Sequence, residues 1–214
     1  MCGITGAVNW GDRQILQKMT DTVAHRGPDD SGLWEARLPD GTWVGLGNRR
    51  LAILDLSAAG HMPMSTPDGS LWITYNGEIY NFRELRQELS AKGHTFLSQT
   101  DTEVILHLYQ ELGPDCVKKL NGMFAFAIWD SRQQELFIAR DHFGIKPLYY
   151  IHQGRRLAFG SEIKSMLVLP DCPRRIDREA LGQYLTFLWV PDPLTMFQGI
   201  LKLPAGHYAR FRQG

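Results

Sequence analysis

The chain has 214 residues, 43% of them hydrophobic, and its 23 basic side chains balance 23 acidic ones. This length and composition favour one large folded domain, or one domain with a tail, over a disordered chain. The neutral charge balance argues against a nucleic-acid partner or an anionic membrane surface, and the longest apolar run, residues 123–129, is far short of the ~20 residues of a membrane span.

The three cysteines, Cys2, Cys116 and Cys172, are an odd number without the spacing of a disulfide framework. This usage indicates a reducing cytoplasm. The N-terminus has no basic region followed by an apolar one, so it does not resemble a secretory signal. The histidines are scattered, and we therefore expect no metal site.

The chain opens with Met1-Cys2-Gly3-Ile4-Thr5-Gly6, at the start of a strand expected over residues 2–9. Removal of Met1 would leave Cys2 with both a thiol and a free α-amine. The reference pKa values of these groups, near ~8.5 and ~7.7–8.0, allow the amine to accept the thiol proton at neutral pH. Cys2 is therefore a candidate nucleophile. The alternative is an ordinary buried thiol near the chain start.

A helix is expected from its cap, Asp12, to about residue 24, followed by a loop over residues 25–32 rich in glycine, proline and aspartate. The charge density of this loop suggests that it orders neighbouring loops. Arg50 precedes an expected strand over residues 52–54, and an inward-pointing Arg50 would need a partner for its charge. The alternative is a surface arginine. Two further strands are expected over residues 33–38 and 43–49.

Asn76-Gly77 follows a strand expected over residues 71–75, and such a pair usually forms a hairpin turn. Here the next segment reads as a helix that starts at Asn81, with Glu84 completing a capping box. An Asn-Gly pair that is not used for a hairpin is a candidate pair of hydrogen-bond donors.

A second helix is expected to open at residues 100–102, with Asp101 as its cap, and to end at Gly113. Residues 122–129 are apolar on both faces, so this strand should lie between a sheet and another layer. Because short turns join antiparallel strands, the element order predicts a layered α+β domain. The remaining expected elements are strands over residues 135–140, 148–152 and 157–160, and helices over residues 162–168 and 177–187.

After Pro170 the pattern changes, and prolines interrupt it up to Gly214. We therefore divide the chain into a core domain, residues 1–169, and a tail, residues 170–214, that leads toward a further domain. We expect the apolar residues of the tail to form an exposed contact surface. They are Trp189, Val190, Leu194, Met196, Phe197, Ile200, Leu201 and Leu203.

Seven stretches of this sequence, in this order, resemble the glutaminase domain of glutamine-dependent asparagine synthetase, a class II glutamine amidotransferase. Together they are far more specific than any one of them. The stretches are Cys2-Gly3-Ile4, His25-Arg26-Gly27-Pro28-Asp29, Arg50-Leu51-Ala52-Ile53-Leu54-Asp55, Tyr75-Asn76-Gly77-Glu78-Ile79-Tyr80-Asn81, Asp101-Thr102-Glu103-Val104-Ile105, Arg140-Asp141-His142-Phe143-Gly144-Ile145-Lys146-Pro147-Leu148-Tyr149 and Gly160-Ser161-Glu162-Ile163-Lys164.

The resemblance implies the N-terminal-nucleophile hydrolase fold, in which two antiparallel sheets pack face to face with helices outside. It also implies that Met1 is removed and that Cys2 attacks the side-chain amide of glutamine. The products would be glutamate and ammonia, formed through a γ-glutamyl thioester.

The same resemblance implies roles for five further residues. The Asn76 side chain and the Gly77 N–H would form an oxyanion hole. Arg50 would pair with the α-carboxylate of glutamine, and Asp101, with Glu78 nearby, would receive its α-ammonium. The chemistry agrees, because a zwitterion needs one fixed cation and one fixed anion, and the amide needs donors aimed at the developing oxyanion.

Asparagine synthetases continue into an ATP-using synthetase domain, whereas this sequence ends at Gly214. We therefore expect ATP and Mg²⁺ to bind outside this chain. A synthetase domain or subunit should be its partner, and the sequence leaves open whether the chain also forms a homodimer. One alternative is a glutaminase that serves a different acceptor, such as a sugar or a polyketide acid. Another is a non-catalytic module for glutamine sensing or partner binding, although the intact residue set favours an enzyme.

Overall fold

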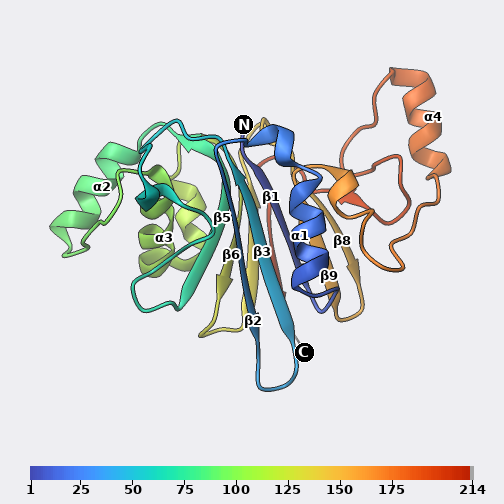
Figure 1. Cartoon of the computed structure of the whole chain (residues 1–214). Coiled ribbons are helices and arrows are strands. Elements are labelled where there is room, and N and C mark those ends of the chain that lie inside the picture. The colour runs from blue at the N-terminus through green and yellow to red at the C-terminus, as the bar shows by residue number, and fades with distance from the viewer. Residues whose placement is uncertain (213–214) are drawn as a thin grey trace.

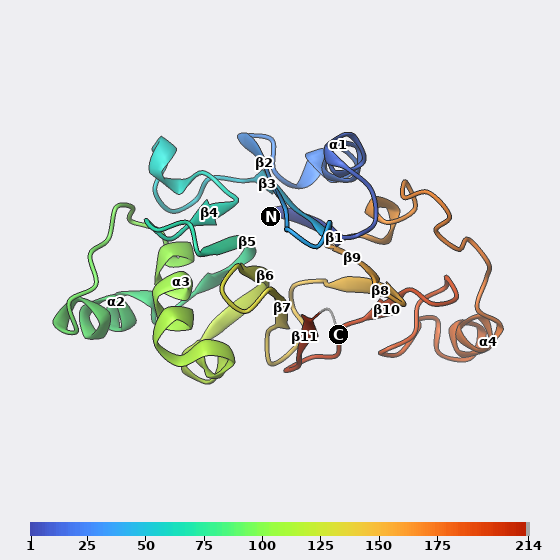
Figure 2. The ribbon, with the colours of Figure 1, turned by 90° about the horizontal axis from the view of Figure 1, so that it is seen from below.

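Two antiparallel sheets packed face to face form the body of the molecule (Figure 1). The computed structural model describes residues 1–212, so residues 213 and 214 of the expected tail lie outside the described residues. Helices cover the outer face of each sheet, as Figure 2 shows from below. The expected α+β class with two stacked sheets and flanking helices is confirmed.

Within residues 1–212 the first sheet has six strands, and β1 lies near its middle, beginning one residue after Cys2. β1 pairs with β3 on one side, where Gly3 lies opposite Arg49, and with β9 on the other. The start of β1 therefore adjoins the end of β3. In spatial order the strands are β10 (Leu201–Lys202), β8 (Tyr149–Gln153), β9 (Arg156–Gly160), β1 (Gly3–Val8), β3 (Trp43–Arg50) and β2 (Asp30–Arg37).

The second sheet has five strands in the part of the chain that the structure describes, and its longest pairing joins β5 to β6 over nine residues. The expected strand over residues 71–75 thus continues to Ile79, so Asn76 and Gly77 lie within β5 and not at its end. The edge strand β4 pairs with Trp72 and Ile73 of β5 and ends before it reaches Asn76 and Gly77. In spatial order the strands are β11 (Tyr208–Arg212), β7 (Glu135–Arg140), β6 (Gly122–Asp130), β5 (Leu71–Ile79) and β4 (Met64–Ser65).

Four α-helices are present in residues 1–212, together with short 3₁₀ segments. α1 packs on the outer face of the first sheet, and α2 and α3 lie on the side of the second sheet (Figure 2). The helices are α1 (Arg13–Asp21), α2 (Phe82–Ala91), α3 (Asp101–Leu112) and α4 (Arg178–Phe187), and the 3₁₀ segments are η1 (Ala24–Arg26), η2 (Ala58–Gly60), η3 (Gly113–Lys119) and η4 (Ile163–Ser165).

One of the three expected helix caps is confirmed, and two are wrong. The Asp12 carboxylate accepts a hydrogen bond from the Ile15 N–H at 2.9 Å, which confirms the cap of α1. The capping box at Asn81 is wrong, because its side chain instead bonds the backbone of residues 119 and 121. Asp101 is not the cap of α3 either, since the Thr100 hydroxyl fills that position and leaves the Asp101 carboxylate for other partners.

Alternate residues of β6 belong to different apolar layers. Phe124, Phe126 and Ile128 are buried in the layer shared with α3, whereas Ala125 and Trp129 are buried in the layer between the sheets. This confirms the expected position of the strand between two layers. Both faces of β6 are removed from water, which stabilises this strand. Its pairing with β5 therefore holds β5 in position.

The tail contributes a strand to each sheet, because β10 pairs with β8 and β11 pairs with β7. Ile200 and Leu203 are buried, so the expectation that they lie on an exposed surface is wrong. Trp189 is 59% exposed, and α4 stands apart from the sheets (Figure 1). The division between residues 169 and 170 stays a prediction.

The expected strand over residues 52–54 is absent, and this segment is a loop. Expected element ends elsewhere shift by a few residues, and the helix expected over residues 162–168 is only the short η4 with turns. Within residues 1–212, no helix combines the length and the apolar character needed to cross a membrane.

Candidate active site

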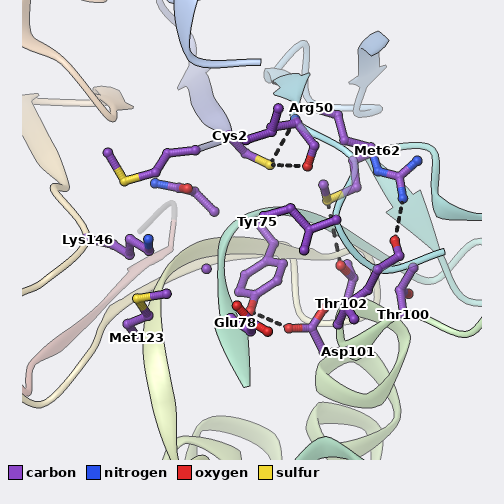
Figure 3. A pocket seen from close by; sticks show the side chains of 16 residues that line it. Cys2, Arg50, Met62, Tyr75, Glu78, Thr100, Asp101, Thr102, Met123 and Lys146 are labelled. Carbon is purple, nitrogen blue, oxygen red and sulfur yellow. Dashed lines mark hydrogen bonds between the residues drawn. The ribbon is translucent and has the colours of Figure 1, made fainter. Parts of the chain in front are cut away.

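The structure brings all six predicted site residues to one cavity, at the place where β1 begins and β3 ends (Figure 3). Cys2 lies directly before β1, and Arg50 is the last residue of β3. Asp101 is the first residue of α3. Asn76, Gly77 and Glu78 come from β5.

The Cys2 thiol lies against the backbone of Leu51. Its Sγ is 3.4 Å from the Leu51 N–H, which donates to it, and 3.7 Å from the Leu51 carbonyl oxygen. Burial raises the pKa of this thiol, the Asp101 charge adds to the rise, and the Leu51 N–H and the Arg50 charge oppose it. Because its pKa is raised, this thiol would need a base in order to attack a carbonyl carbon.

Arg26 positions the Cys2 backbone, because its Nε donates to the Cys2 carbonyl oxygen at 3.1 Å. The same guanidinium donates to Glu162 at 2.8 Å, and the His25 ring also lies 2.8 Å from this carboxylate. Burial raises the pKa of Glu162, but hydrogen bonds from Arg26, Lys164 and His25 outweigh it and lower the pKa to about 2. Arg26 therefore links the chain start to the loop after β9, and His25 contacts that loop as well, in agreement with the expectation that residues 25–32 order neighbouring loops.

Gly27 and Asp29 hold the chain that follows β3. A Cβ on Gly27 would lie 2.3 Å from the Arg49 carbonyl oxygen, so only glycine allows this approach. The Asp29 N–H donates to the Arg50 carbonyl oxygen at 3.1 Å, and the Asp29 carboxylate accepts from the Ala52 N–H at 2.9 Å. These bonds fix the backbone that contacts the Cys2 thiol.

The Arg50 guanidinium is buried, with 6% of the residue exposed. Its Nη2 donates to the carbonyl oxygens of Leu54 at 2.9 Å and Asp55 at 2.6 Å, which bends residues 51–57 around the charge and explains why they form no strand. Within residues 1–212 Arg50 makes no ion pair, so its charge is available to an anionic group in the cavity.

Asn76 carries a buried hydrogen-bond donor without a partner in the part of the chain that the structure describes. The residue is 1% exposed and its Nδ2 makes no hydrogen bond there. Leaving a buried donor unsatisfied costs roughly 1–3 kcal/mol, and such a group calls for a functional explanation. A ligand oxygen in the cavity would satisfy it.

The Gly77 N–H points toward the same region. Along β5, the N–H groups of Leu71 and Ile79 both point away from β6, to Thr66 and Asp101. Backbone direction alternates with period two, so the Gly77 N–H also points away from β6. β4 ends before it reaches this position, and the Gly77 N–H faces the open edge of β5.

Asp101 and Glu78 supply negative charge to the cavity. Asp101 is 5% exposed, and its Oδ2 accepts from the Tyr75 hydroxyl at 2.7 Å and from the Ile79 N–H at 2.9 Å. Burial raises the pKa of Asp101 and the neighbouring Glu78 charge adds to the rise, whereas the two hydrogen bonds lower it. The cavity thus holds Arg50 apart from two carboxylates, a pattern that matches a zwitterionic amino acid.

Sequence reasoning assigned no role to Lys146, which lines the cavity and is 5% exposed. In Figure 3 it lies on the side of Cys2 that faces away from Arg50. Asp141 holds its loop by accepting the N–H groups of residues 143, 145 and 146. Burial lowers the pKa of Lys146, and the Arg26 charge adds to this. Its place in a matched stretch was the only sequence signal.

Three comparisons show which known proteins this chain is similar to. The model of the family described as "Glutamine amidotransferase domain" matches residues 1–214. Asparagine synthetase [glutamine-hydrolyzing] 3 of Bacillus subtilis is 43% identical over 99% of this chain, and the putative asparagine synthetase [glutamine-hydrolyzing] 2 of Methanocaldococcus jannaschii is 38% identical over 96% of it. The chain spans 35% and 43% of the lengths of these relatives.

Among solved structures, glutamine phosphoribosylpyrophosphate amidotransferase from B. subtilis has a TM-score of 0.64 and is 23% identical. The match covers 78% of this chain and 43% of that one. Together with the two stacked antiparallel sheets, this likeness confirms the expected N-terminal-nucleophile hydrolase fold.

Proposed function

Because this chain belongs to the family of glutamine amidotransferase domains, we propose that its cavity hydrolyses the side-chain amide of glutamine to glutamate and ammonia. The observation that carries this proposal is the buried Asn76 Nδ2, which has no partner within residues 1–212 and lies in a cavity that also contains the Cys2 thiol. An amide carbonyl attacked by that thiol would place its oxygen where such a donor is needed.

We propose that Met1 is removed first, which gives Cys2 a free α-amine. That amine takes the thiol proton as Sγ attacks the amide carbon of glutamine, and the oxygen becomes an oxyanion held by the Asn76 side chain and the Gly77 N–H. The carbon–nitrogen bond then breaks, the protonated α-amine returns its proton to the leaving nitrogen, and ammonia departs. A γ-glutamyl thioester on Cys2 remains.

Water completes the cycle. The α-amine of Cys2 accepts a proton from water as the water oxygen attacks the thioester carbon, and the same two donors hold the second oxyanion. The carbon–sulfur bond breaks, the sulfur regains the proton from the amine, and glutamate is released. In this mechanism Arg50 binds the α-carboxylate, and Asp101 and Glu78 bind the α-ammonium.

The direct test is to incubate the purified chain with glutamine and to measure glutamate and ammonia as products. N-terminal mass analysis of the same sample shows whether Met1 is absent, since a retained Met1 blocks the amine. Equal amounts of both products from a chain that begins at Cys2 are expected. A chain that begins at Cys2 and binds glutamine without turnover would instead support the non-catalytic sensing module.

We expect Arg50→Lys to raise KM for glutamine at least about tenfold, because lysine keeps the charge but loses the planar fork that binds a carboxylate through two bonds. The effect on kcat should be smaller. Since Arg50 also bonds the carbonyls of Leu54 and Asp55, steady-state kinetics should be compared at equal folded fraction, judged by thermal melting. An unchanged KM would contradict the assigned role.

The named relatives are about two to three times as long as this chain, and their names include asparagine synthesis. We propose that the ammonia serves asparagine synthesis in a further synthetase domain or subunit, where ATP and Mg²⁺ would bind. An assay of the chain with aspartate, ATP and glutamine should yield glutamate but no asparagine. Asparagine formed by this chain without a partner would contradict the division, and turnover only with another acceptor would favour a different pathway.

We propose that α4 and the residue after it, together with Trp189, form the contact surface for that partner. Leu185, Leu188 and Trp189 are 72%, 80% and 59% exposed, and exposed apolar groups of this size mark contact sites. Without the partner, this surface should promote self-association of the chain.

Replacing Leu185, Leu188 and Trp189 together by serine should therefore reduce the mean particle size in light scattering. The matched control replaces Leu56 and Leu97 by serine. Both are 79% exposed but lie in loops away from α4, so this change should leave the mean particle size unchanged. Identical size distributions for all three proteins would remove the proposed role of the surface. Substitution is preferable to removal of the tail, because the tail adds a strand to each sheet.

We infer that the protein works in a reducing cytoplasm, since its three cysteines are free thiols and the proposed nucleophile must stay reduced. Cell fractionation tests this compartment. Recovery of the protein in an extracellular or periplasmic fraction, with Cys2 oxidised, would contradict it.

A further inference from the structure

The Tyr75 hydroxyl belongs to a buried residue that lines the cavity, and the proposed mechanism gives it no role. Tyr75 is 3% exposed and projects from β5 toward α3, where its hydroxyl donates to Oδ2 of Asp101 at 2.7 Å. The Ile79 N–H donates to the same oxygen at 2.9 Å. Two donors on Oδ2 fix the orientation of the carboxyl group, and neither of them uses Oδ1.

The charge of Asp101 depends on these bonds, because its surroundings otherwise favour the neutral form. Burial is the largest effect that raises the pKa of Asp101, and the Glu78 carboxylate raises it further. The Tyr75 hydroxyl opposes both. The other titratable groups around the cavity are the α-amine at the chain start, the Cys2 thiol, Arg50 at the end of β3, and Lys146.

We infer that Tyr75 is a positioning residue, which holds the Asp101 carboxylate in the orientation and charge state that bind the α-ammonium group of the substrate. The inference rests on the proposed function, since it concerns the same cavity. The Tyr75 ring also packs against Gly77, where a Cβ would lie 2.7 Å from Tyr75 Cε2. Phenylalanine would keep this packing and remove only the hydroxyl.

The test compares Tyr75→Phe with Tyr109→Phe, using glutamine and 4-carbamoylbutanoate, which is glutamine without its α-amine, as substrate or competitive inhibitor. Tyr109 is the matched control, because it is also 3% exposed but its hydroxyl has no partner in residues 1–212. Loss of a hydrogen bond to a charged group should raise KM for glutamine about tenfold in Tyr75→Phe, with kcat changed less than about twofold. Tyr109→Phe should match the unsubstituted chain.

The pH profile gives a second readout. The Asp101 charge is lost as the pH falls through its pKa, and loss of the Tyr75 bond raises that pKa. As the pH is lowered, the affinity for glutamine should therefore begin to weaken at a higher pH in Tyr75→Phe than in the unsubstituted chain. The affinity for 4-carbamoylbutanoate should change little. Because both ligands are measured on one preparation, the ratio of the two affinities does not depend on the folded fraction. In an Asp101→Asn background, Tyr75→Phe should have no further effect on KM.

Equal losses for both ligands, or an unchanged KM and pH profile, would overturn the inference. Absence of glutamine turnover in the unsubstituted chain with a free Cys2 amine would instead overturn the proposed function. The two failures are therefore distinguished within one series of measurements.

Discussion

Replacing Cys2 by alanine is expected to abolish glutamine hydrolysis while leaving glutamine binding nearly intact. The thiol is the group that forms the new bond to substrate carbon, so no weaker version of the reaction remains once it is removed. Arg50 and Asp101, which the account assigns to the two charged ends of glutamine, are untouched by the change. Ammonia release measures the loss, and calorimetric titration with glutamine measures the binding.

Cys116→Ala and Cys172→Ala are the controls for this prediction. Both thiols are buried outside the cavity, in the layers beside α3 and beside α1, and burial raises the pKa of each, to about 12 for Cys116. Each control should lower stability and leave the specific activity of the folded protein unchanged. Normal ammonia release by Cys2→Ala would refute the mechanism.

Replacing Asn76 by alanine is expected to lower kcat by roughly 10²–10³-fold, with little effect on KM, because an oxyanion donor acts mainly in the transition state. The stability of the folded protein should not fall with the activity. Among the described residues the buried Asn76 Nδ2 has no partner, so its removal also removes a desolvation cost, and the melting temperature should be unchanged or higher.

Asn48→Ala provides the contrasting case. Asn48 is also 1% exposed, but its Nδ2 donates to the Thr74 hydroxyl at 3.0 Å and to the Tyr75 carbonyl oxygen at 3.2 Å. The Asn48 Oδ1 has no partner within residues 1–212, but loss of the side chain also breaks two satisfied bonds between the sheets, so a lower melting temperature is expected. A variant Asn76→Ala that turns over normally, or one that only melts earlier, would reduce Asn76 to a structural residue.

Features set by neighbouring residues could be predicted from the sequence. The cap of α1 depends on Asp12 and a backbone group three residues later, and the two apolar faces of β6 are visible as an unbroken apolar run. The resemblance further identified six residues that the fold brings together from four separate segments. Their roles remain predictions, because they concern bonds to a substrate.

Features set by distant residues could not be predicted. Residues 52–54 have the composition of a strand, but the buried Arg50 charge attracts the carbonyls of the following loop and curls it. Asn81 fits a capping box, yet the backbone of residues 119 and 121 offers it better partners. Lys146 resembles any surface lysine until the fold buries it. The short strands β10 and β11 form by pairing with the edges of β8 and β7, which lie far earlier in the sequence.

The central claim is that Cys2, freed of Met1, is acylated by glutamine, and intact mass spectrometry after rapid acid quenching tests it most directly. Acid protonates the amine and slows thioester hydrolysis, so the intermediate can be isolated and the chain digested to locate it. The account predicts a protein without Met1 that carries one γ-glutamyl group on its N-terminal peptide, and no such group in Cys2→Ala. Turnover of glutamine by a chain that retains Met1, or acylation at Cys116 or Cys172, would contradict it.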